Sequence, residues 1–299
     1  MGEEDVAAIS TLLHLAAVAD DHRPLGEHQW LDLVQGGRRG FAGFVAWEPG
    51  HSHPVGYAQV SRGESNGTWA VEVVVDPHHR DATSTVGSDL LRAALDEVGR
   101  AGGGHVHLWV AKPTPHHDEM AAANGLSKGR DLYQMRRPLP VAGEAADLAT
   151  RPFRPGQDEE AWLEVNNRAF AWHPEQGGWD LTTIQRRERE PWFDPDGFLL
   201  HEEEGRLAGF CWTKVHSDLS PPIGEIYVIA VDPDFQGRGL GRRLVLAGLD
   251  WLARAGLDLA MLYVDASNEP AVALYRNLGF TVDHTDRAYV GDIPPRRPR

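Results

Sequence analysis

The sequence predicts an α/β protein of the α+β type, with two tandem copies of one unit in which helices flank a mixed, mainly antiparallel sheet. The 299 residues suit two domains of about 100–200 residues each. A residue-level repeat supports this, because Val73-Val-Val-Asp-Pro77 recurs as Ile229-Ala-Val-Asp-Pro233, 156 residues later. Leu108-Trp-Val110 likewise recurs as Leu262-Tyr-Val264, 154 residues later.

Apolar periodicity predicts the same order of elements in both copies. In the first copy we expect helices at 5–20 and 28–34, strands at 41–47, 55–60 and 69–75, a helix at 90–98 and a strand at 102–110. In the second we expect a helix at 161–170, strands at 198–201, 207–214 and 227–231, a helix at 240–254, a strand at 259–264 and a helix at 269–277.

Composition suggests where the copies meet. Arg137-Pro-Leu-Pro-Val-Ala-Gly-Glu-Ala-Ala146 has the proline and small-residue content of a linker. The predicted domains are therefore residues 1–142 and 150–292, followed by a flexible tail at 293–299.

Charge and cysteine content exclude several classes of protein. The formal net charge of −15 argues against a nucleic-acid partner, which requires a basic face. Apolar runs are too short for a membrane span, and the acidic N-terminus lacks the plan of a secretory signal. A single cysteine, Cys211, excludes an internal disulfide and cysteine metal clusters. We expect a cytoplasmic monomer that acts on a small molecule.

The stretch from Tyr227 to Leu244 carries the most chemistry. A strand ends at Asp232-Pro233, and a turn with alternating glycines, Gln236 to Gly241, leads into an amphipathic helix. Such a turn exposes backbone N–H groups at a helix N-terminus, where an anion binds. Arg238, Arg242 and Arg243 add positive charge. The turn lacks the Gly-Lys-Ser/Thr of a Walker loop and the glycine spacing of a dinucleotide fingerprint. The alternative is an ordinary glycine-rich connector.

The pattern Gln/Arg-x-x-Gly-x-Gly/Ala in this turn resembles the pyrophosphate loop of the GNAT acetyltransferase superfamily, which binds acetyl-CoA. A second stretch, Asn268-x-x-Ala-x-x-Leu-Tyr-x-x-x-Gly-Phe280, resembles the C-terminal part of that fold. The resemblance implies that Tyr275 protonates the leaving thiolate, whereas the alternative is a half-buried aromatic side chain. Glu225, two residues before Tyr227, could accept the amine proton directly or through water, or could be an exposed carboxylate.

Further motifs resemble the mycothiol synthases, which are tandem GNAT enzymes. They include Asn166 to Trp179, Trp192 to Gly197, Trp212 to His216, Gly224 to Val228 and Gln134 to Leu139. The resemblance implies acetyl transfer from acetyl-CoA to the cysteinyl amine of a cysteine–glucosamine–inositol (Cys-GlcN-inositol) pseudo-disaccharide. The alternatives are a GNAT enzyme for another amine, such as an aminoglycoside, a polyamine or a protein N-terminus, and a non-catalytic acetyl-CoA-binding module.

Site residues follow from the resemblance position by position. The implied substrate-binding residues are Glu27, Glu175, Lys214, Glu225 and Tyr263. The implied acetyl-CoA-binding residues are Val73, Val74, Val75, Ile229, Ala230, Val231, Gln236, Gly237, Arg238, Gly239, Leu240, Gly241, Arg242, Asn268, Glu269, Pro270, Ala271, Val272 and Ala273. Independently, carboxylates suit a cationic amine. The plainer alternatives are that Glu175 caps a turn and that Lys214 is a charge at a strand edge.

The two copies differ at the phosphate loop. The first copy has His79-Arg-Asp-Ala-Thr-Ser-Thr-Val-Gly87, with one glycine and a negative charge at Asp81. Thr85 is β-branched and resists the positive φ that glycine allows. We expect weak or altered pyrophosphate binding there. The loop histidines, among them His51, His53 and His79, lack acidic partners at a fixed spacing, so we expect no metal site. We expect Trp172, Trp179 and Trp192 either to line a sugar site or to pack in the core or between the domains.

Overall fold

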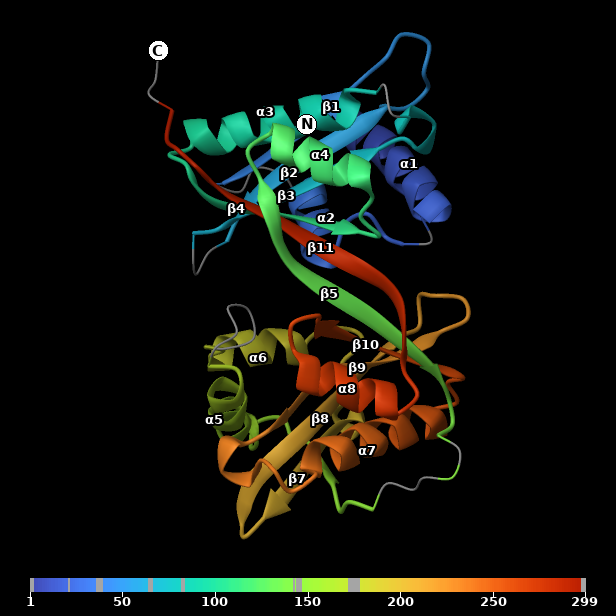
Figure 1. Ribbon diagram of the computed structural model, residues 1–299, viewed down its shortest axis with the longest axis vertical. Helices are drawn as coiled ribbons and strands as arrows, with labels where there is room; N and C mark the ends of the chain where they lie inside the picture. Colours follow the sequence, from blue (N-terminus) through green and yellow to red (C-terminus); the bar gives the residue numbers. More distant parts are fainter. Residues whose placement is uncertain are drawn as a thin grey trace. The chain divides into compact units, whose positions relative to one another are not determined.

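The computed structural model describes residues 3–20, 22–35, 40–63, 67–81, 84–141, 143, 147–171 and 178–296 (Figure 1). The chain forms two compact units, of which the first comprises Met1–Leu132 with His284–Arg299 and the second Tyr133–Asp283. Two long strands, β5 (Ser127–Pro138) and β11 (Thr281–Ile293), contribute residues to both units. The units thus divide the chain differently from the predicted domains, and the boundaries drawn from the linker composition stay a prediction.

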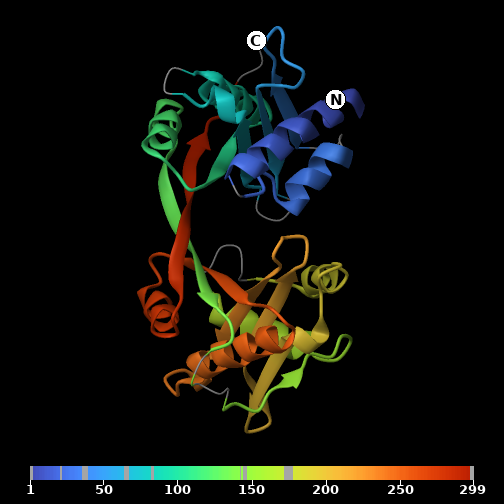
Figure 2. The same cartoon turned by 90° about the vertical axis from the view of Figure 1, so that its right-hand side faces the viewer.

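The first unit contains helices on both faces of its strands. Its elements are α1 (Glu3–Asp20), α2 (Glu27–Gln35), β1 (Phe41–Ala46), β2 (Gly56–Arg62), β3 (Trp69–Val75), the 3₁₀ turn η1 (Pro77–His79), α3 (Val86–Arg100), β4 (Gly104–Ala111) and α4 (Pro115–Ala123). Strands β1, β2 and β3 are antiparallel, and β4 runs parallel to β3. Helices α1 and α2 cover one face, and α3 and α4 the other (Figure 2).

The second unit repeats this plan. Its elements are β6 (Arg151–Pro152), α5 (Glu159–Ala169), α6 (Leu181–Glu188), η2 (Pro195–Gly197), β7 (Phe198–Glu203), β8 (Arg206–His216), β9 (Ile223–Val231), η3 (Pro233–Phe235), α7 (Leu240–Arg254), β10 (Leu259–Asp265) and α8 (Glu269–Asn277). Strands β6 to β9 are antiparallel neighbours, and β10 is parallel to β9. An aromatic core under α5 and an aliphatic core under α7 and α8 fill the two faces.

The predicted mixed sheet and all the predicted helices and strands are present, with ends moved by a few residues. The sequence did not predict α4, α6, β5, the short β6 or β11. The missed strands are rich in charge, so their pattern resembles a loop, but that charge is paired in the fold. Arg287 of β11 donates through Nε and Nη2 to the Asp131 carboxylate at 2.7 and 2.9 Å, and through Nη1 to Asp118 at 3.1 Å.

Both segments expected to be irregular are partly ordered. Strand β5 runs through Pro138 and so includes the first two residues of the expected linker, where a proline at a strand end costs no ladder bond. In the expected tail, Ile293 ends β11, and the Arg296 N–H donates to Gly99 O at 2.8 Å. Residues 297–299 of that tail lie outside the described part. None of the described helices is long and apolar enough to cross a membrane.

Glu72 should make the stability of the first unit depend on pH. It lies opposite Gln59 in the β2–β3 register, on the face that carries α1 and α2. Burial raises its pKa to about 8, against about 4.3 in an unfolded chain. Because the folded protein holds this proton more tightly than the unfolded chain does, the contribution of Glu72 to stability is fully present below the unfolded pKa. It is lost as pH rises through the folded pKa of about 8. We expect Glu72→Gln to raise the melting temperature more at about pH 9 than at about pH 5. An equal shift at both pH values would contradict this.

Candidate active site

Strand β9 separates from β10 halfway along its length. The parallel pairing with β10 ends where Ile226 lies opposite Leu262, whereas antiparallel pairing with β8 continues to Val231. On the side of β9 that faces β10, the backbone N–H and C=O groups of residues 227–231 therefore take no part in the ladder with β10. An extended ligand arm can add to such an edge as a strand would. Ile229 to Val231, the predicted thioester-binding residues, lie in this part of β9.

A bulge marks the same place. Trp212 pairs with Val228 but Thr213 pairs with Ile226, so Tyr227 is the extra residue on β9. Ile226 packs into the aliphatic core, whereas Tyr227 and Val228 both pack into the aromatic core. Bulges re-aim side chains in this way and are common beside active sites.

The glycine-rich turn directly follows β9. Asp232 accepts from the Asp234 N–H at 2.9 Å and closes η3, and the chain then passes Gly237 (φ +77°) and Gly239 (φ +74°) into α7. Gly239 is the N-cap residue and supplies no side chain to the free N–H groups of the first helical turn. Those groups, with the positive end of the helix dipole, are what an anion site at a helix N-terminus requires, and the predicted pyrophosphate site stays a prediction.

The arginines of this turn have different partners. Arg238 Nη1 lies 3.2 Å from Glu203 Oε2, and its guanidinium lies over the Phe235 ring. Arg243 donates through Nε and Nη2 to Asp147 O at 2.9 and 2.6 Å. It therefore binds the backbone of the segment before β6. Arg242 is exposed in the first turn of α7. Arg238 and Arg242 remain the expected anion-binding cations.

Substitution of Gly239 tests the turn. Nothing lies within 4 Å of a Cβ added at Gly239, so Gly239→Ala would act through the left-handed backbone, at a cost of about 1–2 kcal/mol, and by obstructing close approach of an anion. We expect at least a tenfold rise in KM for acetyl-CoA. Gly256 is a matched control at the other end of α7, with φ +85° and equally open space. Gly256→Ala should lower the melting temperature similarly and leave this KM unchanged; an equal KM rise in both variants would count against an anion site.

Glu225 has a histidine partner. It lies on β9 opposite Lys214 of β8 and is 7% exposed. His216 Nε2, two residues further along β8, lies 2.7 Å from Glu225 Oε2. In the sequence, His216 stood out only as the last residue of the Trp212 to His216 motif. The alternation of Trp212, Lys214 and His216 nevertheless places three chemically distinctive side chains on one face of β8. That period-2 pattern was the signal that could have identified it.

Lys214 lies against two aromatic rings. Its Nζ is 4.5 Å from the centroid of Trp192 and 5.7 Å from that of Tyr227, distances typical of cation–π interactions. Trp192 also packs edge-on against Tyr227, and Trp179 packs against Trp162 in the aromatic core. Trp179 and Trp192 therefore both pack against aromatic side chains of the second unit. Trp172 lies outside the described residues.

Tyr263 and Tyr275 differ in how their hydroxyl groups are held. Tyr263 Oη accepts a 2.7 Å hydrogen bond from Gln134 Nε2, and Arg136 Nε donates to Gln134 Oε1 at 2.7 Å. Tyr275 lies on α8 in the aliphatic core and is 7% exposed. Its hydroxyl has no hydrogen-bond partner among the described residues. Burial, followed by the Cys211 thiol, raises the pKa of Tyr275, so its hydroxyl stays protonated at neutral pH.

Helix α8 begins as the sequence predicted. The Asn268 side chain accepts from the Ala271 N–H at 3.3 Å, and Gly279 takes φ +82° just after the helix. Glu269 to Ala273 form its first turns. Figure 1 shows α7 and α8 on the same face of the second unit.

The corresponding turn in the first unit is built differently. Strand β3 also separates from β4, since their pairing ends at Val71 opposite Leu108, and this leaves Val73 to Val75 beyond the ladder. Thr85, before α3, has φ −98°. Arg80 is bound to Asp20 at 2.6 and 3.0 Å. In its described residues this turn lacks the left-handed glycines of its counterpart.

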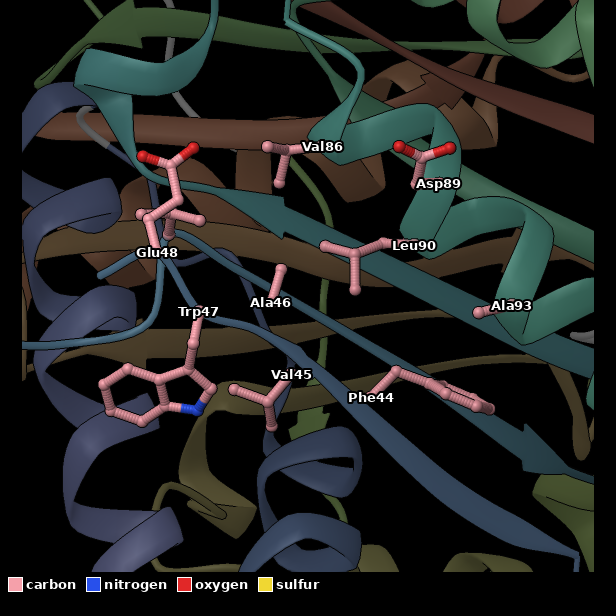
Figure 3. Close-up of a pocket in the computed structure, with 10 residues that line it drawn as sticks. Phe44, Val45, Ala46, Trp47, Glu48, Val86, Asp89, Leu90 and Ala93 are labelled. Atoms are coloured by element: carbon pink, nitrogen blue, oxygen red, sulfur yellow. The ribbon is translucent and has the colours of Figure 1, made fainter. Parts of the chain in front are cut away.

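Two predicted substrate residues cannot be placed by their side chains. Glu27 begins α2 of the first unit, but its side chain lies outside the described part, as does all of Glu175. A cavity of about 380 Å³ in the first unit has none of the predicted site residues in its lining. It is lined mainly by apolar side chains of β1 and α3, and also by the acidic side chains of Glu48 and Asp89 (Figure 3).

Comparison with known proteins agrees with this geometry. Residues 160–280 match the Acetyltransferase (GNAT) family. The fold is shared with a tandem GNAT protein from the clavulanic acid biosynthesis pathway, at a TM-score of 0.71 and 18% identity, covering 99% of this chain and 97% of that one. The protein is therefore a tandem GNAT-fold protein.

Sequence relatives define the family more narrowly. The chain is 43% identical over 295 residues to a mycothiol acetyltransferase of Acidimicrobium ferrooxidans, covering 96% of this chain and 94% of that protein. It is 45% identical over 284 residues to a mycothiol acetyltransferase of Thermobispora bispora, covering 93% and 92%. The chain belongs to the mycothiol acetyltransferase family.

Proposed function

We propose that this protein transfers the acetyl group of acetyl-CoA to the cysteinyl amine of Cys-GlcN-inositol, which gives mycothiol. The proposal rests on three structural features that the second unit combines. These are the part of β9 beyond the β10 ladder, the left-handed glycine turn that opens α7, and the buried carboxylate of Glu225, two residues before the free strand segment. Family membership supports the choice of substrate.

Acetyl-CoA would lie along these features. The pantetheine arm would add to the free edge of β9 at Ile229 to Val231 and contact the first turns of α8, while the pyrophosphate would meet the turn from Gln236 to Arg242. Backbone N–H groups of the bulged strand would stabilise the oxyanion of the tetrahedral intermediate. Val73 to Val75 offer a similar edge in the first unit, but the described residues of the turn there include no left-handed glycine.

Proton transfer divides between two residues. Glu225 would take the proton from the amine, directly or through a water molecule, so that the neutral amine attacks the thioester carbonyl. Tyr275 would donate its proton to the departing thiolate of CoA. Its hydroxyl is protonated at neutral pH and uncommitted to any described residue, as a proton donor to a ligand should be. These steps require no metal ion.

Lys214, Tyr263, Glu27 and Glu175 would recognise the amine substrate. Lys214 and the hydrogen-bonded pair of Tyr263 and Gln134 lie on β8, β10 and β5 of the second unit and offer donors to hydroxyl and carbonyl groups. Glu225 adds negative charge suited to a cationic amine before its deprotonation. The alternative is that the protein acts on another amine. With Cys-GlcN-inositol as the substrate, we expect Lys214→Ala to raise the KM for this amine.

His216 acts as a positioning residue for Glu225. Its 2.7 Å contact fixes the carboxylate, so His216→Ala should lower kcat about tenfold with little change in the KM for acetyl-CoA. His216→Gln retains an N–H donor and should recover part of the loss. A purely structural role would instead lower the melting temperature of both variants without this difference in kcat.

Steady-state kinetics with a panel of amines test the proposal. Loss of the thioester absorbance should be rapid with Cys-GlcN-inositol and slow with glucosamine, an aminoglycoside or a polyamine. A thiol-reactive dye is unsuitable because the substrate itself contains a thiol. Faster turnover of any other amine in the panel would replace the proposed substrate and leave the acetyltransferase assignment intact.

A further inference from the structure

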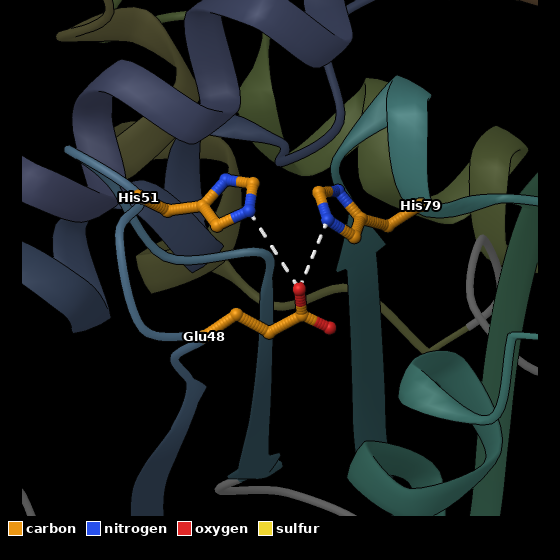
Figure 4. A group of neighbouring side chains, drawn as sticks. All are labelled: Glu48, His51 and His79. Carbon is orange, nitrogen blue, oxygen red and sulfur yellow. Dashed lines mark ion pairs between the residues drawn. The ribbon is translucent and has the colours of Figure 1, made fainter.

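Three side chains from two separate segments of the first unit converge at its surface. Glu48 and His51 belong to the connection between β1 and β2, and His79 ends η1 after β3. Figure 4 shows both imidazole rings directed at the Glu48 carboxylate. The Nε2 atoms of His51 and His79 lie 3.6 and 3.4 Å from the same oxygen, Glu48 Oε2. All three donor atoms lie within 4.8 Å of one another.

These separations suit a metal better than hydrogen bonds. A good N–H···O bond spans about 2.7–3.2 Å, which is shorter than either contact. Zinc binds nitrogen and carboxylate oxygen at about 2.0–2.2 Å, so neighbouring ligand atoms of a tetrahedral site lie about 3.4 Å apart. The two N···O separations match such edges. We propose that Glu48, His51 and His79 form a binding site for a transition-metal ion of the Zn²⁺ type, with water completing the coordination.

A second layer of contacts holds His79 in the required orientation. Its Nδ1 lies 3.3 Å from Asp76 Oδ1, slightly beyond the range of a good hydrogen bond, and its Nε2 faces Glu48. Asp76 is 1% exposed and is fixed by the His78 N–H at 2.8 Å and by His53 Nε2 at 2.7 Å. A carboxylate behind a ligating histidine is the usual arrangement at metal sites because it sets the tautomer and ring orientation.

The donor set selects the metal. Two imidazoles and one carboxylate suit Zn²⁺ or a neighbouring transition metal, whereas Mg²⁺ and Ca²⁺ prefer an all-oxygen shell. At the equivalent position of the second unit, 156 residues later, Phe235 is buried between Arg206 and Arg238. The first unit thus has an imidazole where the second has an apolar side chain. The ion would tie the turn after β3 to the β1–β2 connection, and the site does not depend on the proposed function.

Metal titration of the full chain, purified without a polyhistidine tag and freed of metal with EDTA, tests the site. Zn²⁺ competed against a chromophoric chelator should bind at one ion per chain and raise the melting temperature. Co²⁺ should give the visible absorption of a tetrahedral site. His51→Ala and His79→Ala should each weaken Zn²⁺ binding at least tenfold, and Asp76→Asn about 10–100-fold.

A matched control separates this site from ordinary surface histidines. His105 pairs with Asp292 at 2.8 Å on β4 and β11. His105→Ala should leave Zn²⁺ binding unchanged. Circular dichroism of each variant without metal shows whether it is folded, and Glu48→Gln, which alters an exposed side chain, is the variant least prone to misfold. The proposal is overturned if Zn²⁺ does not bind saturably, or if folded His51→Ala and His79→Ala variants bind it as well as the wild type does.

Discussion

Glu225→Gln should reduce kcat by about 10²–10⁴, the usual contribution of a positioned general base. The amide is isosteric with the carboxylate but cannot accept the amine proton. Acetyl-CoA binds through the β9 backbone and the α7 turn in this account, so its Kd should stay within about twofold of the wild-type value. Single-turnover rates and calorimetric binding of acetyl-CoA measure the two quantities separately.

Asp292→Asn is the matched control for Glu225→Gln. It removes the same charge from another histidine–carboxylate pair, with His105 and Asp292 joined at 2.8 Å in the first unit. Activity of the control should equal that of the wild type. Full activity of Glu225→Gln would show that another group, or bulk water, takes the proton.

Tyr275→Phe should lower kcat about 10²-fold without destabilising the protein. The substitution removes only a hydroxyl group that no described residue hydrogen-bonds, so the melting temperature should not fall. Since burial raises the pKa of Tyr275, its hydroxyl remains a proton donor across the neutral range, and no rate loss from its ionisation is expected near neutral pH. The measurements are thermal unfolding and kcat with saturating acetyl-CoA.

Tyr263→Phe gives an informative contrast. Its hydroxyl accepts the Gln134 hydrogen bond, so its removal leaves Gln134 without that partner. We expect this variant to raise the KM for the amine substrate more than it lowers kcat. If Tyr275→Phe behaves in the same way, or retains the wild-type kcat, Tyr275 is not the acid and its aromatic ring serves only to pack the core.

Local chemistry explains what could be predicted from the sequence. The glycine turn, the Asp232-Pro233 break and the Asn268 cap depend on residues within a few positions of one another, and all three occur in the fold. The repeat predicted two similar units because each copy preserves its apolar pattern. In contrast, β5 and β11 depend on ion pairs such as Arg287 with Asp131, which are far apart in the chain.

The site residues that the sequence did not identify also depend on contacts between distant segments of the chain. His216 is recognisable as the partner of Glu225 only when the register of β8 against β9 is known. Gln134 likewise meets Tyr263 through tertiary contact alone. In the first unit, the fold places the Glu48 carboxylate next to His51 and His79. The sequence did not predict this acidic neighbour. Sequence spacing identifies helix faces and turns, but it cannot supply such cross-segment contacts.

Mass spectrometry of the product tests the central proposal most directly. The purified protein would be incubated with acetyl-CoA and Cys-GlcN-inositol, and fragmentation would locate the added acetyl group. We expect one acetyl group on the cysteinyl nitrogen of the product, and no such product from Glu225→Gln. Acetylation of another atom, or no product from protein that still binds acetyl-CoA, would contradict the proposed substrate while leaving the fold and the anion-binding turn in place.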